Sequence, residues 1–233
     1  SACIVLYHSG MHVLHAVQCF QESDIELELH VVDNSPGGTL GEHLQWQCPG
    51  VQYYPQRKDL GYAGGCNLVI PNLRSQYHLV CHPDVTFDDK LLSNMVNYME
   101  RNKDCVILTP KVLNADGTEQ FLPKRAPTIK YLLGSALKKW PGPFKAWNAE
   151  YTLEGADIRT PTSVEVADGC FLLIRTGILR QLQDIAAAEI AAGGAVALLV
   201  NGLVVKLIAL VGNMGNSLPC EYGCMTCVAA WHN

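Results

Sequence analysis

Charged residues are scarce in this chain, and it has no excess of basic residues. Only 17% of its 233 residues are Asp, Glu, Lys or Arg, and the formal net charge is −5 at pH 7. A nucleic-acid-binding protein would need a basic stripe, so this class is excluded. The hydrophobic content of 48% excludes a disordered chain. A chain of this length can bury a core that needs no disulfides or metal to stabilise it.

Charge nearly disappears near the end of the chain. Residues 1–184 hold 16 of the 17 Lys and Arg and 20 of the 22 Asp and Glu, whereas residues 185–233 contain only Glu189, Lys206 and Glu221. A change this abrupt predicts a boundary, with one domain over residues 1–183 and a divergent tail over residues 184–233.

Signs of a secreted, disulfide-rich protein are also missing. Seven cysteines are scattered singly before residue 183, and no signal peptide precedes the first apolar run at residues 2–7. We therefore expect reduced, mostly buried thiols and a cytoplasmic protein.

Apolar segments alternate along residues 1–183 in the manner of strands and helices. Strands are predicted at residues 2–7, 25–32, 51–54, 77–81, 105–108 and 171–174, and helices at residues 11–20, 40–46, 67–74 and 88–101. Residues 124–155, where prolines and aromatic residues are mixed, are predicted to be irregular. This alternation predicts an α/β fold with a mostly parallel sheet that is covered by helices on both faces.

Polar, turn-forming residues occur at three places that this topology brings together. They are Asp33–Ser35, Asp59–Tyr62 and His82–Asp84. Ligands of such sheets bind beyond the carboxyl ends of the strands, so we expect one crevice there. Asp33 can accept hydrogen bonds from a nucleobase or a ribose, or it can simply close its strand with an Asx turn.

The glycine-rich segment Gly61–Asn67 matches neither the dinucleotide fingerprint nor the P-loop. It can let a diphosphate approach the backbone at a helix N-terminus, or it can be a plain turn. Asp84 is a hard oxygen ligand suited to Mg²⁺ or Mn²⁺. His82 either adds a second ligand or ends its strand.

Six segments together resemble the inverting nucleotide-sugar glycosyltransferases of the GT-A fold, glycosyltransferase family 2, and in particular its bacterial rhamnosyltransferase-like branch. The segments are Ile4–Tyr7, Val31–Ser35, Asp59–Asn67, His78–Val85, Thr109–Gly117 and Gly169–Arg175. The resemblance covers residues 2–182. It implies a Rossmann-like, mostly parallel central sheet flanked by helices.

The resemblance also implies roles for single residues. Tyr7 and Asp33 would line the pocket for the nucleotide base, while Gly61, Gly64 and Asn67 would lie over the nucleotide. The implied donor is a nucleotide diphosphate sugar such as dTDP-rhamnose, and the implied acceptor is a saccharide or a lipid-linked molecule in surface polysaccharide synthesis. Such an enzyme would work in the cytoplasm or at the inner face of the plasma membrane.

The metal site is implied in the same way. Asp84 stands where the family has its metal-binding aspartate, so Mg²⁺ or Mn²⁺ is the expected cofactor. His82 and Asp59 replace asparagines that the family commonly carries, which changes the expected metal preference and donor affinity.

The family pattern stops after Gln183. The family continues with a Glu-Asp pair that supplies the general base, and this chain has no such pair, so the catalytic base is unknown. Glu165 and Asp168 are the first candidates. The chain is therefore either an impaired glycosyltransferase or a nucleotide-sugar binder without activity.

The tail allows several interpretations. Residues 190–212 are apolar except for Asn201 and Lys206. They are long enough to span a bilayer, and the chain would then be a membrane-anchored interaction protein. Alternatively, they form a buried segment. A second feature is a set of residues whose spacing is compatible with zinc or an iron–sulfur cluster: Cys220, Cys224, Cys227 and His232. A reading-frame shift near residue 184 would explain both.

Overall fold

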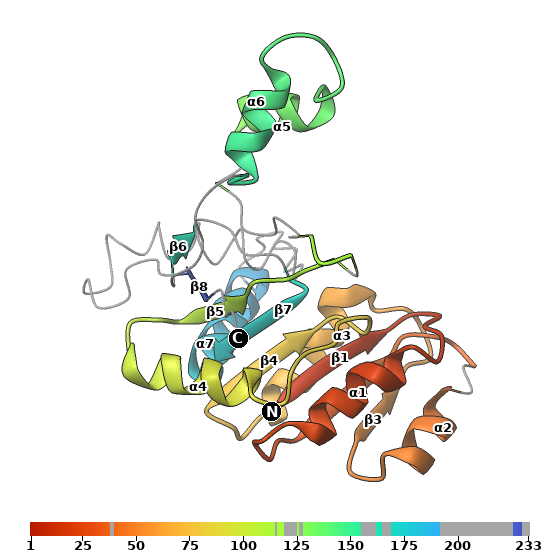
Figure 1. The fold of residues 1–233 in the computed structure, drawn as a ribbon. Helices are drawn as coiled ribbons and strands as arrows, with labels where there is room; N and C mark the ends of the chain where they lie inside the picture. The colour runs from red at the N-terminus through yellow and green to blue at the C-terminus, as the bar shows by residue number, and fades with distance from the viewer. Residues whose placement is uncertain are drawn as a thin grey trace.

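A computed structural model describes residues 1–37, 40–114, 116–118, 125, 128–154, 162–164, 169–191 and 226–229 (Figure 1). In chain order its elements are β1 (Ala2–Leu6), α1 (Val13–Glu22), β2 (Leu29–Asp33), α2 (Leu40–Gln47), β3 (Gln52–Pro55), α3 (Gly61–Val69), the 3₁₀ turn η1 (Ile70–Asn72), β4 (Tyr77–Cys81), α4 (Leu91–Arg101), β5 (Ile107–Pro110), α5 (Ile129–Ala136), α6 (Phe144–Tyr151), β6 (Thr162–Val164), β7 (Phe171–Arg175), α7 (Thr176–Ala191) and β8 (Thr226–Ala229).

The strands form one sheet in the order β3-β2-β1-β4-β7-β5-β8-β6. Strands β3, β2, β1 and β4 pair in parallel, whereas β7 pairs antiparallel with both β4 and β5. Strands β1 to β5 therefore all run in the same direction, and β7 lies between β4 and β5 in the opposite direction. The predicted sheet, mostly parallel and flanked by helices, is confirmed.

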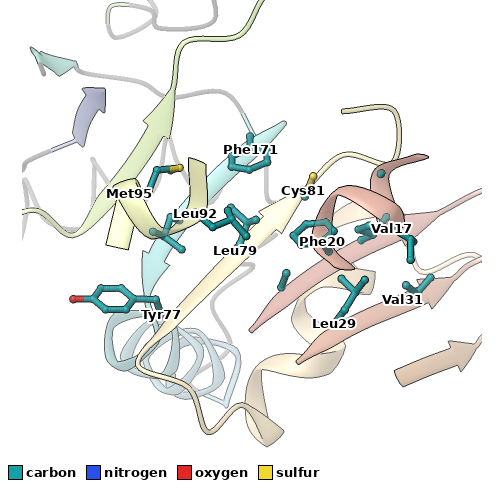
Figure 2. Close-up of a cluster of buried hydrophobic side chains, with 14 of the residues drawn as sticks. Val17, Phe20, Leu29, Val31, Tyr77, Leu79, Cys81, Leu92, Met95 and Phe171 are labelled. Carbon is teal, nitrogen blue, oxygen red and sulfur yellow. The ribbon is translucent and has the colours of Figure 1, made fainter. Parts of the chain in front are cut away.

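Helices cover both faces of this sheet, and each face has its own core. On one face, α1 and α4 pack over the strands, with Phe20 and Met95 among the buried side chains (Figure 2). On the other face, Cys66 of α3 and Leu179 of α7 pack against Val5 and Leu172. Because both faces are covered, the central strands β1, β2, β4 and β5 are buried along their whole length and are mostly apolar, as expected for a parallel sheet.

The second strand differs from its prediction. The alternation of apolar residues from Ile25 onward predicted a strand over residues 25–32, but β2 begins only at Leu29. All five of its residues are buried, so its two faces both contact protein. The alternation in residues 25–28 reflects a loop whose apolar members, Ile25 and Leu27, pack against the edge of the core.

The helix after the third strand also begins earlier than predicted. Residues 67–74 were expected to be helical, but α3 starts at Gly61 and ends at Val69. A Cβ atom on Gly65 would lie 2.6 Å from Cγ1 of Val5, which is closer than real contacts allow. Gly65 therefore lets this helix lie directly on β1, and the segment that looked like a turn is helical.

Residues 124–155 are not irregular as predicted. They contain α5 and α6, which form an antiparallel helical hairpin that stands apart from the sheet, with their connecting loop at the far end (Figure 1). The Thr128 side chain caps α5 by accepting a hydrogen bond from the backbone N–H of Tyr131, at 3.3 Å. Gly142 has a φ of +125° in the connecting loop, a conformation that favours glycine.

The predicted boundary at residue 184 falls inside α7, whose backbone continues to Ala191. Most of the predicted apolar segment at 190–212 and the candidate ligands Cys220, Cys224 and His232 lie outside the described residues, and of Cys227 only the backbone is described, in β8. Within the described ranges, no helix is long and apolar enough to cross a membrane. Five of the seven cysteines before residue 183 are buried, namely Cys3, Cys48, Cys66, Cys81 and Cys105.

Candidate functional site

Five chain segments meet at the carboxyl edge of the parallel strands. The ends of β1, β2 and β4 lead into Tyr7, Asp33–Asn34 and His82–Asp84, and α3 begins beside them at Gly61. Residues 169–170 arrive at the same edge, because β7 runs antiparallel to β4 and begins where β4 ends. Hydrogen bonds connect these segments, so the three predicted polar motifs do converge on one edge.

Asp33 is buried, with 2% of its surface exposed, and ends β2. One carboxylate oxygen accepts a hydrogen bond from the Tyr53 hydroxyl at 2.6 Å, and the other accepts from the backbone N–H of Ser35 at 2.8 Å. The Ser35 bond is the Asx turn that was the structural alternative for this residue. A carboxylate has about four acceptor positions, and the described residues occupy two of those of Asp33.

The environment of Asp33 also acts on Tyr53. Burial raises the pKa of the Tyr53 phenol, and the hydrogen bond to the Asp33 carboxylate raises this pKa further. The phenol therefore stays protonated and keeps donating to Asp33. This fixes the orientation of the carboxylate at the end of β2.

Asn34 belongs to the predicted polar motif Asp33–Ser35 but was assigned no role, and it connects three segments at the edge. Its side-chain NH₂ donates to the carbonyl of Gly61 at 3.0 Å, and its backbone N–H donates to the carbonyl of Leu6 at 2.9 Å. Its side-chain oxygen is buried and has no hydrogen-bond partner among the described residues. The clue in the sequence was an amide next to Asp33, two residues after the predicted strand.

The start of α3 is held by residues of the preceding loop. Gly61 has a φ of +69°, and its backbone N–H donates to the Asp59 carboxylate at 2.7 Å. A Cβ atom on Gly64 would lie 2.9 Å from the Cβ atom of Leu60, so this position is also crowded. Gly61 thus lies at the edge, while Gly64 is about 4.5 Å and Asn67 about 9 Å further along the helix axis. The Asn67 carbonyl accepts a hydrogen bond from the Gln183 side chain.

His82 and Asp84 form a contact pair beyond the end of β4. Nδ1 of His82 is in hydrogen-bonding contact with a carboxylate oxygen of Asp84. Both side chains are exposed, His82 to 47% and Asp84 to 64%. The backbone N–H of His82 donates to the carbonyl of Cys170 at 2.8 Å, which fixes the loop against the start of β7. The exposed Asp84 carboxylate fits Mg²⁺ or Mn²⁺, which bind few protein ligands and take further oxygens from phosphates. The His82 imidazole is a nitrogen ligand and is less typical of these ions. No group of three metal-ligating side chains occurs among the described residues.

Tyr62 lies between the start of α3 and the metal-binding candidates, and the sequence did not assign it a role. Its hydroxyl donates to the carbonyl of Gly169 at 3.0 Å, and its ring centroid is 6.3 Å from that of His82. Burial raises the pKa of this phenol, so it remains a donor. Tyr62 therefore ties α3 to the segment that precedes β7.

Tyr7 is the most exposed aromatic residue at this edge, with 56% of its surface accessible. It directly follows Leu6, which pairs in register with Asp33. His8 packs edge-to-face against its ring and donates a backbone hydrogen bond to the Ser35 hydroxyl at 2.7 Å. The predicted base-pocket residues Tyr7 and Asp33 thus end neighbouring strands. The candidate bases Glu165 and Asp168 lie outside the described residues.

Comparison with known proteins gives one family and many similar folds. The sequence model described as glycosyl transferase family 2 matches residues 1–182. No curated protein matches the chain. The first 349 residues of Staphylococcus aureus TarS give a TM-score of 0.52 at 13% identity, with 78% of this chain and 48% of that chain covered.

Two further solved structures share this fold. TarS 1–349 in complex with UDP-GlcNAc gives a TM-score of 0.52 at 14% identity, covering 78% of this chain and 46% of that one. The mannosyltransferase PcManGT from Pyrobaculum calidifontis, in complex with GDP-Man and Mn²⁺, gives 0.52 at 13% identity, covering 78% and 45%. This chain therefore spans less than half the length of each of these proteins, and the likeness is one of fold.

Proposed function

The chain belongs to glycosyl transferase family 2, and we propose that its sheet edge binds a nucleotide diphosphate sugar and transfers the sugar to an acceptor hydroxyl. The supporting observation is that Asp33, Asp84 and the start of α3 share one edge of the sheet. These are an acceptor for a base or ribose, a ligand for a hard cation, and a helix N-terminus that favours anions.

Each part of the donor has a matching group in this proposal. The Asp33 carboxylate, oriented by Tyr53, accepts hydrogen bonds from the base or the ribose, and the Tyr7 ring covers the base. The backbone at Gly61 and Gly64 lies next to the diphosphate. Asp84 and His82 would hold Mg²⁺ or Mn²⁺, which supplies positive charge to the diphosphate leaving group.

The chemistry is a single displacement at the anomeric carbon. The acceptor oxygen forms a new bond to this carbon while the bond to the diphosphate breaks, and the configuration inverts. The nucleoside diphosphate departs, and the hydroxyl proton goes to a carboxylate. Glu165 and Asp168 are the candidates for this base, because the family's Glu-Asp pair is absent after Gln183.

We further propose dTDP-rhamnose as the donor and a saccharide or lipid-linked acceptor in bacterial surface polysaccharide synthesis, in the cytoplasm or at the inner membrane face. These assignments rest on the resemblance of the sequence motifs to the rhamnosyltransferase-like branch. The similar structures carry UDP-GlcNAc and GDP-Man, so donors within this fold differ in both base and sugar. A panel of uridine, thymidine and guanosine diphosphates tests the base directly.

The competing function is donor binding without turnover. It is favoured by the low charge of residues 185–233, which contain only two acidic residues, Glu189 and Glu221. General-base catalysis typically contributes about 10²–10⁴-fold, so transfer without it would be slow. A chimera that joins residues 1–183 to an intact family tail distinguishes the two functions. Equal turnover of the native chain and the chimera would establish a base in this chain.

Calorimetric titration of a nucleoside diphosphate, with and without Mg²⁺ or Mn²⁺, tests the donor site. We expect the metal to strengthen binding and Asp84→Asn to remove this gain. His82→Asn should be mild, because it restores the residue that the family carries. Asp104→Asn is the matched control, since Asp104 is exposed and precedes β5 at the opposite edge of the sheet. Equal affinity with and without metal would contradict the role of Asp84.

A further inference from the structure

The outer face of the α5–α6 hairpin is apolar and is not covered by any described part of the protein. Ile129, Leu132 and Leu133 lie at helical spacing along one face of α5, and 78%, 58% and 44% of their surfaces are exposed. The opposite face of α5 packs on α6, where Tyr131 stacks on Tyr151 with a centroid distance of 5.4 Å. The outer stripe is therefore additional to the contacts that hold the hairpin together.

The loop at the far end of the hairpin continues this surface. It reads Lys138-Lys139-Trp140-Pro141-Gly142-Pro143, and every one of these residues is exposed, with 68% of Trp140 accessible. Figure 1 shows this loop at the end of the hairpin that points away from the sheet. A tryptophan next to lysines is the combination found where proteins enter the interface between water and lipid.

The charge of the hairpin is opposite to that of the whole chain. Residues 128–154 contain four lysines and two glutamates, whereas the chain as a whole has a net charge of −5. Lys130 forms an ion pair with Glu150 at 2.6 Å, near the base of the hairpin. The remaining lysines, Lys138, Lys139 and Lys145, lie in the connecting loop and the first turn of α6 and leave that end positive.

We propose that the hairpin docks on an anionic lipid bilayer, with Trp140 and the outer stripe of α5 in the interface and the lysines facing lipid phosphates. Positive charge beside an apolar stripe matches an anionic membrane surface, whereas an apolar stripe alone would match many partners. This is peripheral binding and requires no spanning helix. It goes beyond the proposed transfer reaction, and it would hold the sheet edge near acceptors that are anchored in lipid.

Sedimentation of the full chain with vesicles tests the proposal. Binding should be strong with phosphatidylcholine vesicles that also contain phosphatidylglycerol, weak with phosphatidylcholine alone, and reduced by salt. Lys138→Gln combined with Lys139→Gln should lower the partition coefficient by roughly 10- to 30-fold, since each basic residue near such a surface contributes about fivefold. Lys90→Gln combined with Lys103→Gln removes two exposed charges elsewhere and should change binding much less.

A second pair of variants, Trp140→Ala and Trp46→Ala, tests the apolar contribution to vesicle binding. Trp140→Ala should weaken vesicle binding by about 10-fold through loss of buried apolar area. Trp46→Ala should leave it unchanged, because Trp46 is 81% exposed but lies on α2, outside the hairpin. Brominated lipids should quench the fluorescence of the wild-type chain more than that of Trp140→Phe.

The outcomes separate this proposal from the donor site. The hairpin variants should bind nucleoside diphosphate normally, and Asp84→Asn should bind vesicles normally. Vesicle binding that is equally strong in all hairpin variants would overturn the proposal and assign binding to another part of the chain. A lipid-free chain whose oligomeric state changes on Trp140→Ala would also overturn it, because the stripe would then be an interface between copies.

Discussion

The sheet and the α5–α6 hairpin are stabilised in different ways. Every residue of β1, β2, β4 and β5 is buried, and helices cover both faces. In the hairpin only Tyr131 and Gly134 are buried in α5, and no residue is buried in α6. The sheet therefore depends on a shared core, whereas the hairpin depends on contacts between two short helices. A change in one region should leave the function of the other largely intact.

The largest expected effect comes from the core of the sheet. Phe171 is fully buried in β7 (Figure 2). Its ring packs edge-to-face on Phe87, with centroids 5.3 Å apart. Phe171→Ala should lower the free energy of unfolding by about 3–5 kcal/mol, because the cavity cannot close completely. Trp140→Ala, in the hairpin loop, should change it by less than about 0.5 kcal/mol. Urea unfolding measures both, and similar losses would mean that the two regions share one core.

A second prediction concerns the contact between α3 and β1. Gly65→Ala places a methyl group within 2.6 Å of Val5 Cγ1, so the helix must move away from the sheet. We expect a loss of about 1–3 kcal/mol in the free energy of unfolding. Weaker nucleoside diphosphate binding should accompany it, since the start of α3 borders the donor site.

Gly177→Ala is the control for this change. A Cβ atom there meets nothing within 4 Å, and the residue is helical in α7. Alanine should be neutral or stabilise the protein by about 0.5–1 kcal/mol. Equal destabilisation by both substitutions would show that the packing of Gly65 on Val5 is not the cause.

The sequence was sufficient to predict the parts of the fold where burial dictates residue type. The strand at 77–81 and the helix packed through Leu92 and Met95 were correctly predicted, because a buried element needs a continuous or periodic apolar pattern. The start of α3 was missed because three glycines read as a turn. The structure gives each glycine a separate reason: Gly61 has a positive φ, Gly64 is crowded by Leu60, and Gly65 packs against Val5.

The hairpin was missed for the opposite reason. The apolar stripe of α5 faces outward, so no core partner in the sequence marks it as a helix. At the candidate site, the convergence of Asp33 and Asp84 followed from strand order, since parallel strands end at one edge. The connecting roles of Asn34 and Tyr62 could not be predicted, because they depend on carbonyl groups of Gly61 and Gly169 that only the fold brings near.

A third prediction uses the pH dependence of stability. His78 is fully buried in β4, and burial lowers its pKa to about 3, with smaller contributions from the chain's terminal ammonium group and His30. The unfolded chain binds a proton at this residue near pH 6.5 while the folded chain does not, so stability falls as the pH decreases below about 6.5. The loss should approach about 1.4 kcal/mol per pH unit.

His78→Gln should make the free energy of unfolding depend less on pH between pH 6.5 and 4.5. His15→Gln provides the matched comparison, since it removes an exposed imidazole on α1 in place of a buried one. If the slope of the His78 variant equals that of the wild type, the folded protein protonates this side chain. The local packing of β4 would then be looser than the burial of His78 indicates.

The smallest global effect is expected from Gly134→Ala, which tests whether the hairpin is a separate unit. A Cβ atom at this position would lie 2.8 Å from the Cβ atom of Trp147 and 3.0 Å from the backbone nitrogen of Asn148, so α5 and α6 must separate. The near-ultraviolet signal and fluorescence of Trp147 should change. The urea midpoint of the sheet should shift by less than the equivalent of about 0.5 kcal/mol, and nucleoside diphosphate affinity should stay the same, because sites that share no contacts act additively.

Ser135→Ala, one residue further along the same helix and exposed, should change none of these quantities. A large shift in the sheet's midpoint with Gly134→Ala alone would show that the hairpin unfolds together with the sheet, and the two regions would then form one cooperative unit.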